Sequence, residues 1–264
     1  MNKNLRILLI TAISFTVYYI LDELYFSELR KALNEKINQF GVSHLLTYII
    51  SAFPLVVGAC LMHGIKGVIR SFGLNKSIFK GFVFSLICTA PMLIGYAFVF
   101  ERSNEVTINK ILINVFAAAF FEELFFRGFL FGQIYRFTKF GFIPSVFIGA
   151  FLFAFVHLYQ SRELTTLIGV LSITFLGAIL FAWTYAEWNF NIWVPIFLHL
   201  LMNLFWTLFS VADNAFGGIY ANVFRTISLI LIVLLTILYK RKKGIPLGIN
   251  KKTMWMKKDF SASL

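Results

Sequence analysis

Residues 81–100 read GFVFSLICTAPMLIGYAFVF, twenty consecutive positions without a charged side chain. A helix needs about 20 apolar residues to cross a hydrocarbon core roughly 30 Å thick. Similar blocks recur along the chain and lack the alternation of polar and apolar residues that soluble elements show. Composition agrees, because 59% of the 264 residues are hydrophobic, 14% are charged and the mean hydropathy is +0.81. The sequence therefore predicts an integral membrane protein.

The predicted fold is all-α, a polytopic helical membrane bundle with about eight transmembrane helices. Backbone groups in lipid must be paired within each segment, which favours helices, and no alternating pattern suggests a barrel. Residues 1–264 are interpreted as one membrane domain, because no repeat or linker divides them. The predicted spans lie near residues 5–21, 44–63, 81–100, 109–133, 144–160, 164–186, 192–211 and 219–239.

The basic residues predict an orientation. Eight spans place both termini on one side, and a cytoplasmic N-terminus gives sixteen Lys and Arg residues on inner segments against six on outer loops. This bias fits the positive-inside rule, so both termini are predicted to be cytoplasmic, with the cell membrane as the expected location. The tail 240–264 is predicted to face anionic headgroups of the bilayer. Topology thus accounts for the net charge of +12, and no nucleic-acid partner is expected.

Charged side chains inside the fourth predicted span are the informative exceptions. Residues 120–128 read FFEELFFRG, which places Glu122, Glu123 and Arg127 in an otherwise apolar block. Each ionised side chain at mid-membrane costs about 2.5–3.5 kcal/mol on insertion scales. Glu123 and Arg127 stand four apart and are predicted to pair on one helix face. Glu122 lies about 100° around an α-helix from Glu123, which leaves it free to exchange protons.

Polar residues also interrupt the fifth and seventh spans. The fifth ends at His157, which the predicted orientation puts near the outer face although Glu122 lies near mid-membrane. The seventh carries His199 and Asn203 four apart on one face, and Pro195 before them is expected to kink that helix. Arg225, in the eighth span, is expected to extend toward the interface.

The economical interpretation is one water-accessible cavity shared by three helices. Glu122, His157 and His199 would offer it a general base, a second acid or base, and a hydrogen-bond donor. Each set also has an ordinary structural interpretation, as a folding-specificity network, a satisfied helix-end histidine, or an interhelical hydrogen-bond pair. Cys60 and Cys88 lack metal-ligand spacing and are interpreted as small apolar residues.

Together the three elements resemble the CAAX-protease and bacteriocin-processing (CPBP, also called Abi) family of intramembrane endopeptidases. That family's pattern is Glu-Glu-x-x-x-Arg on one helix, Phe-x-x-x-His on a second and His-x-x-x-Asn/Asp on a third. The sequence carries these in the same order, and the resemblance covers about residues 109–207. The matching residues are Glu122, Glu123, Arg127, Phe153, His157, His199 and Asn203.

The resemblance implies a peptidase acting on a membrane-associated peptide or protein. It implies that Glu122 and His157 activate a water, that His199 and Asn203 stabilise the oxyanion, and that Glu123 with Arg127 supports the site. A metal-free glutamate mechanism is the favoured expectation. A zinc metalloprotease, with Glu122, His157 and His199 as ligands, is the alternative, although no His-Glu-x-x-His motif is present.

Two other classes of function compete with hydrolysis. Some relatives of this fold lack the motif residues, so a non-catalytic membrane scaffold or a bacteriocin self-immunity protein is one alternative. A proton-coupled transporter could use the same charged residues as a relay, but the sequence shows no repeat symmetry or paired broken helices. The retained motif residues favour the hydrolase.

Overall fold

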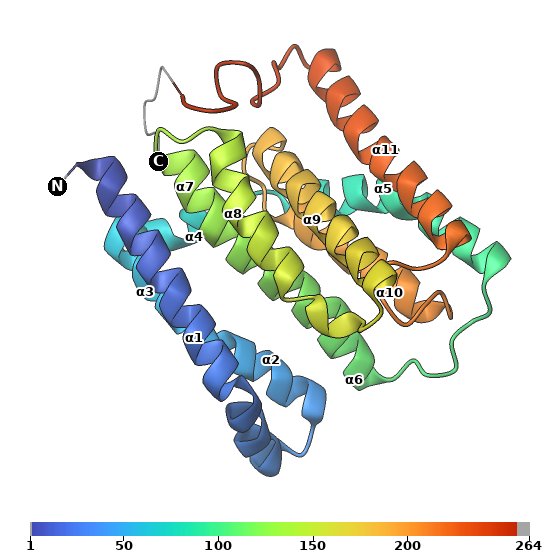
Figure 1. Ribbon diagram of the computed structural model, residues 1–264. Coiled ribbons are helices and arrows are strands. Elements are labelled where there is room, and N and C mark those ends of the chain that lie inside the picture. The colour runs from blue at the N-terminus through green and yellow to red at the C-terminus, as the bar shows by residue number, and fades with distance from the viewer. Residues whose placement is uncertain (1, 258–264) are drawn as a thin grey trace.

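The computed structural model describes residues 2–257, and within them regular structure is helical apart from two isolated β-bridges, Arg102–Phe209 and Phe140–Met256. The predicted all-α class is confirmed (Figure 1). Residues 258–264 of the predicted basic tail lie outside the described part of the chain. The helices are α1 (Lys3–Ile37), α2 (Phe40–Ser51), α3 (Phe53–His63), α4 (Val68–Phe72), α5 (Ile78–Val99), α6 (Ile108–Lys110), η2 (Ile111–Phe131), α7 (Gly132–Phe137), α8 (Phe142–Phe155), α9 (Leu164–Glu187), α10 (Trp193–Leu208) and α11 (Ile219–Lys242).

Six helical segments in the described region are long and apolar enough to cross a membrane, namely Lys3–Ile37, Phe40–His63, Ile78–Val99, Phe142–Gln160, Leu164–Glu187 and Ile219–Lys242. The chain is thus a polytopic helical membrane protein with about six to seven spans, and the predicted count of eight is too high by this measure. Helix α10 is apolar but has only 16 residues, about 24 Å at 1.5 Å per residue. Helix η2 is outside the six, and it carries the costly charges of Glu122, Glu123 and Arg127.

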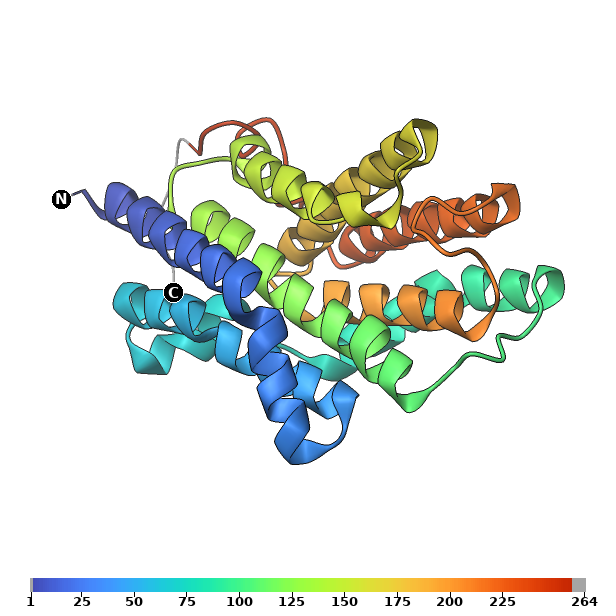
Figure 2. The ribbon, with the colours of Figure 1, turned by 60° about the horizontal axis from the view of Figure 1, so that its bottom comes forward.

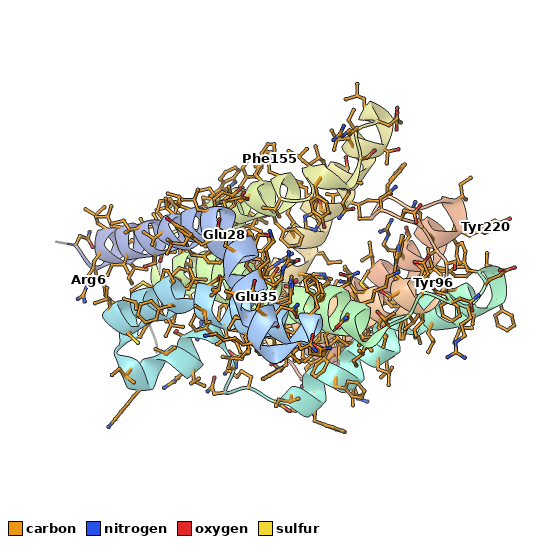
Figure 3. All side chains as sticks on the ribbon, turned by 90° about the horizontal axis from the view of Figure 1, so that it is seen from below. Arg6, Glu28, Glu35, Tyr96, Phe155 and Tyr220 are labelled. Carbon is orange, nitrogen blue, oxygen red and sulfur yellow. The ribbon has the colours of Figure 1, made fainter. Side chains whose placement is uncertain are left out.

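The first helix is longer than a membrane is thick. α1 continues without a break through the charged segment after residue 21, and its 35 residues extend about 52 Å. The charged segment after the predicted span 5–21 is therefore the second half of α1. Figure 3 shows Glu28 and Glu35 on this half.

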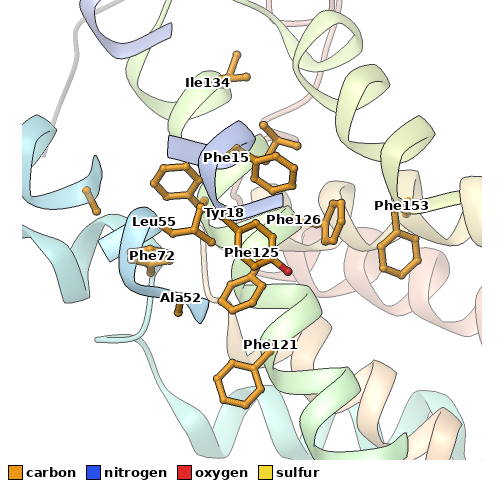
Figure 4. Packing of buried hydrophobic residues seen from close by; sticks show 14 of the residues in the cluster. Phe15, Tyr18, Ala52, Leu55, Phe72, Phe121, Phe125, Phe126, Ile134 and Phe153 are labelled. Atoms are coloured by element: carbon orange, nitrogen blue, oxygen red, sulfur yellow. The ribbon is translucent and has the colours of Figure 1, made fainter. Parts of the chain in front are cut away.

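Helix η2 runs through the centre of the bundle (Figure 2), and residues 125–131 of its second half are all buried. It packs against α10, α2, α8 and α1. Its phenylalanines meet aromatic residues of α1 edge to face, with ring centroids 5.5 Å apart for Phe126–Phe15 and 4.9 Å for Phe125–Tyr18 (Figure 4). Because lipid tails are as apolar as these side chains, such close packing is what holds helices together in a bilayer.

The two ends of the bundle differ. At the end that we call the tail end, the start of α1 lies near residues 243–257, which cross the ends of several helices (Figure 1). There the backbone N–H groups of Gly141 and Phe142 donate to carbonyls of Trp255 and Thr253 at 2.7 and 2.8 Å. These bonds satisfy free donors at the start of α8. The opposite end, which we call the mouth end, holds residues 100–107, 156–163 and 209–218.

Candidate active site

The centre of the site is η2, whose backbone is wound as a π-helix with i→i+5 hydrogen bonds. Such winding is rare and occurs frequently at functional sites. Glu122 is partly exposed, and it has no hydrogen bond or ion pair with any other described residue. Glu123 is fully buried and Arg127 is 2% exposed. The two adjacent carboxylates therefore occupy different environments, one open and one enclosed.

Glu123 contacts two partners through one oxygen. Its Oε1 lies 3.1 Å from Arg127 Nη1, which confirms the predicted ion pair, and 2.9 Å from His199 Nδ1. A carboxylate oxygen accepts a hydrogen bond, so the proton of the neutral imidazole resides on Nδ1. Nε2 is then the unprotonated ring nitrogen and is available to a ligand. Spacing along the sequence gives no sign of the Glu123–His199 contact, because the two residues lie 76 positions apart.

His157 follows the end of α8 and is held by local contacts. Its Nδ1 lies 2.7 Å from the backbone carbonyl oxygen of Phe153, and its ring packs 4.8 Å from the Phe153 ring. A carbonyl can only accept, so Nδ1 carries the proton and the neutral ring presents Nε2 as a proton acceptor. The sequence places His157 at the last turn of a helix, and the structure places it just beyond that turn.

Helix α10 supplies His199 and Asn203. The Nδ2 atom of Asn203 donates to the backbone carbonyl of Asn114 on η2 at 2.8 Å, which ties the two helices together. The predicted kink at Pro195 is wrong, because α10 begins at Trp193 and Pro195 lies in its first turn. At that position the missing backbone N–H would have had no partner within the helix.

One cavity of about 1390 Å³ is lined by Glu122, Arg127, His157, His199 and Asn203. The structure therefore brings together side chains from η2, the end of α8, and α10, as the shared-cavity interpretation expects. Glu123 lies behind this surface rather than on it. The catalytic roles of these residues stay predictions.

The cavity extends to the mouth end, where its lining includes residues 101–105, 159–160 and 210–215. Figure 3 views the bundle from below, with Phe155 of α8 and Tyr220 of α11 labelled. His157 thus shares a cavity with Glu122 even though it follows the last turn of α8. At the mouth Lys110 donates to Glu105 at 2.5 Å, which lowers the pKa of that carboxyl.

Arg225 also lines this cavity, and its expected extension toward the interface stays a prediction. It is 8% exposed and donates to the backbone carbonyls of Ala215 and Phe216 at 2.7 and 2.8 Å. Its guanidinium lies 5.1 Å from the centre of the Trp206 ring. Arg225 therefore holds the loop that borders the mouth. In the sequence, this residue could be identified because it is a charged side chain within a predicted span.

The candidate zinc ligands are not grouped as a metal site. Across residues 2–257, no three His, Cys, Asp or Glu side chains are grouped closely enough to hold a metal ion. The alternative ligand set of Glu122, His157 and His199 is therefore not gathered for zinc in this arrangement.

Comparison with known proteins supports the motif region. Residues 104–205 match the family described as "Type II CAAX prenyl endopeptidase Rce1-like", and this segment contains every motif residue named above. Over 95 residues the chain is 35% identical to the "Putative membrane peptidase YdiL" of Bacillus subtilis (strain 168). The match covers 36% of this chain and 34% of that protein, so the chain spans about a third of the length of this curated relative. No solved structure shows a significant match. The resemblance to CAAX-type membrane endopeptidases is thereby confirmed over residues 104–205.

Proposed function

We propose that this chain, whose central segment is Rce1-like, is an intramembrane endopeptidase that hydrolyses a peptide bond of a membrane-associated peptide or protein. The observation that carries the proposal is the cavity shared by Glu122, His157, His199 and Asn203. An unpaired carboxylate, two imidazoles and an amide in one cavity are the groups that water activation and oxyanion binding need.

In the proposed reaction Glu122 and His157 hold and deprotonate a water molecule. The water oxygen attacks the carbonyl carbon, and the C=O electron pair moves to oxygen as an oxyanion. The proton taken from water passes to the leaving nitrogen as the C–N bond breaks, which gives a carboxylic acid and an amine. Microscopic reversibility allows the same group to act first as base and then as acid.

Glu123 has a defined part in this scheme as a positioning residue. For His199 to donate through Nε2 to an oxyanion while Nδ1–H is bonded to Glu123, the ring must be an imidazolium. The Glu123 carboxylate, 2.9 Å from Nδ1, would be the counter-ion of that imidazolium. The Asp of a serine-protease triad orients and stabilises its histidine by the same principle.

The proposed mechanism is metal-free and uses no step through a bound ion. The choice is supported by the placement of the candidate ligands, since no three His, Cys, Asp or Glu side chains within residues 2–257 are grouped closely enough to hold a metal ion. We expect cleavage by purified protein to survive prolonged dialysis against EDTA and 1,10-phenanthroline. Activity that is lost on chelation and regained with zinc alone would show that the metalloprotease alternative is correct.

The function is tested with membranes from cells carrying the native chain or Glu122→Gln. We expect at least one peptide to accumulate in the variant membranes and to be cleaved when native protein is added. Immunoblotting should show equal amounts of both proteins, since Glu122 has no structural partner among the described residues. Identical peptidomes would contradict the proposal. A cellular phenotype that survives combined Glu122→Ala and His199→Ala would favour the scaffold or immunity protein instead.

A further inference from the structure

The guanidinium of Arg127 is the part of the cavity lining that the proposed roles leave without a chemical task. Its side chain is 2% exposed and borders the cavity together with Glu122. Nη1 lies 3.1 Å from Glu123 Oε1 but not in hydrogen-bonding geometry, so within the described chain neither Nη1 nor Nη2 has an acceptor. Burying donors of a charged group without acceptors is strongly unfavourable. These two atoms therefore indicate a place for an oxygen that comes from outside the chain.

Aromatic rings fix the orientation of this guanidinium. Its central carbon lies 4.3 Å from the centre of the Phe153 ring and 5.6 Å from that of Phe181. Contacts with ring faces attract the cation but leave its N–H groups, which lie in the guanidinium plane, free to donate. Arg127 is thus a preorganised donor, and binding an oxygen there would need little rearrangement.

The winding of η2 explains why Arg127 reaches the same cavity as Glu122. In an α-helix a residue five positions on lies about 140° away, on a different face. The i→i+5 hydrogen bonding of η2 widens each turn and brings the fifth residue closer to the face of the first. Spacing on an α-helix placed Arg127 on the face of Glu123, with Glu122 about 100° away, yet both Glu122 and Arg127 line the cavity.

We propose that Arg127 is a further catalytic residue, whose Nη1 and Nη2 donors bind the carbonyl oxygen of the scissile peptide and stabilise the charge that develops on it. This inference rests on the proposed endopeptidase function. When water attacks the carbonyl carbon, the π electron pair moves to the oxygen held by Arg127, and no proton passes to or from the guanidinium. Collapse of the intermediate returns that pair to the carbonyl as the C–N bond breaks.

Charge supports this role over that of a simple brace for Glu123. A guanidinium carries its donors and its charge without gaining a proton, whereas His199 must gain a second proton to donate through Nε2. Only one Glu123 oxygen contacts Arg127, and that oxygen is shared with His199. The ion pair therefore leaves the guanidinium with donors and positive charge for a second, transient anion.

The test compares two uncleavable analogues of the peptide that accumulates in Glu122→Gln membranes. One carries a phosphinate at the scissile position, which mimics the tetrahedral oxyanion. The other carries a reduced amide, which has no oxygen there. Their dissociation constants are measured on full-length native protein, Arg127→Gln and Arg127→Lys. Arg136→Gln is the matched control, since Arg136 lies in the neighbouring α7 and does not line the cavity.

We expect Arg127→Gln to weaken phosphinate binding by about 100-fold, the typical effect of losing an oxyanion donor, while reduced-amide binding changes less than about threefold. Arg127→Lys keeps the positive charge, and its dissociation constant for the phosphinate should lie between those of native protein and Arg127→Gln. Arg136→Gln should leave the ratio of the two constants unchanged. If Arg127→Gln weakens the binding of both analogues by the same factor, Arg127 only supports the position of Glu123 and the inference is overturned. If native protein itself shows no preference for the phosphinate, the endopeptidase proposal fails as well.

Discussion

Glu122 and Glu123 are neighbours in sequence, and the structure predicts opposite consequences for replacing each with glutamine. Glu123 is fully buried and its Oε1 contacts both Arg127 and His199. Glu122 is partly exposed to the cavity, and no hydrogen bond or ion pair joins it to another described residue. We expect Glu122→Gln to abolish cleavage at native stability, and Glu123→Gln to lower both stability and activity.

The size of the Glu123→Gln effect follows from its contacts. Removing the carboxylate leaves the Arg127 charge buried without a counter-ion, which costs about 3–5 kcal/mol. The charge-assisted hydrogen bond to His199 is itself typically about 1.5–3 kcal/mol. Because one oxygen serves both partners, the two terms overlap and do not add. We therefore expect a loss of about 3–5 kcal/mol for Glu123→Gln, against less than about 1 kcal/mol for Glu122→Gln.

The assay is reversible unfolding of purified protein in detergent micelles, followed by tryptophan fluorescence, with cleavage measured on the same samples. A second variant, Glu123→Gln with Arg127→Met, removes the stranded charge and should regain most of the lost stability without regaining activity. Native-like stability of Glu123→Gln would refute the reasoning. So would an equal loss of stability in Glu122→Gln, since that would make both carboxylates structural.

Three further predictions concern the scaffold. A β-carbon on Gly81 would lie 2.8 Å from the backbone carbonyl carbon of Trp193. Gly81→Val should therefore force α5 and α10 apart, which we expect to lower the free energy of unfolding by about 1–3 kcal/mol and to reduce cleavage. Glu187 accepts hydrogen bonds from Lys240 and from the backbone N–H groups of residues 248 and 249, the last two at 3.0 and 2.8 Å. Glu187→Gln should therefore release the segment 245–257 and speed cleavage of that segment by an added protease. An unchanged rate would show that these contacts do not hold the segment in place. Glu105→Cys, at the mouth, should react with a membrane-impermeant maleimide in intact cells if both termini are cytoplasmic. Labelling only after permeabilisation would show that the protein has the opposite orientation.

Much of the fold could be predicted from the sequence because apolar blocks are long and charges inside them are costly. Every predicted span falls on helical segments of the structure, although the span 44–63 covers both α2 and α3, and length alone could not tell which segments can cross a membrane. α10 is short because it begins at Trp193, where Pro195 fits the first turn. The full length of α1 was missed because charged side chains after residue 21 end the apolar block from which the span 5–21 was predicted.

The site was predictable in composition but not in its contacts. Three motifs identified the cavity-lining residues, since polar side chains in apolar spans need a shared wet environment. Spacing could not reveal that Glu123 reaches His199 across 76 positions, because that contact depends on how two helices pack. Nor could it reveal that Arg127 borders the cavity, because spacing arguments assumed α-helical winding where the backbone is a π-helix.

The position of the cavity mouth bears on what kind of substrate can enter. The mouth is formed by residues 101–105 and 210–215, at the end of the bundle opposite the segment 243–257. If the basic tail end faces the cytoplasm, as its charge predicts, the mouth opens toward the outer face of the membrane. Water and the polar backbone of a substrate would then enter from outside, which favours an exported or membrane-anchored peptide over a cytoplasmic one. The opposite orientation would admit a substrate from the cytoplasm, so the labelling of Glu105→Cys also identifies the side of the membrane from which a substrate enters.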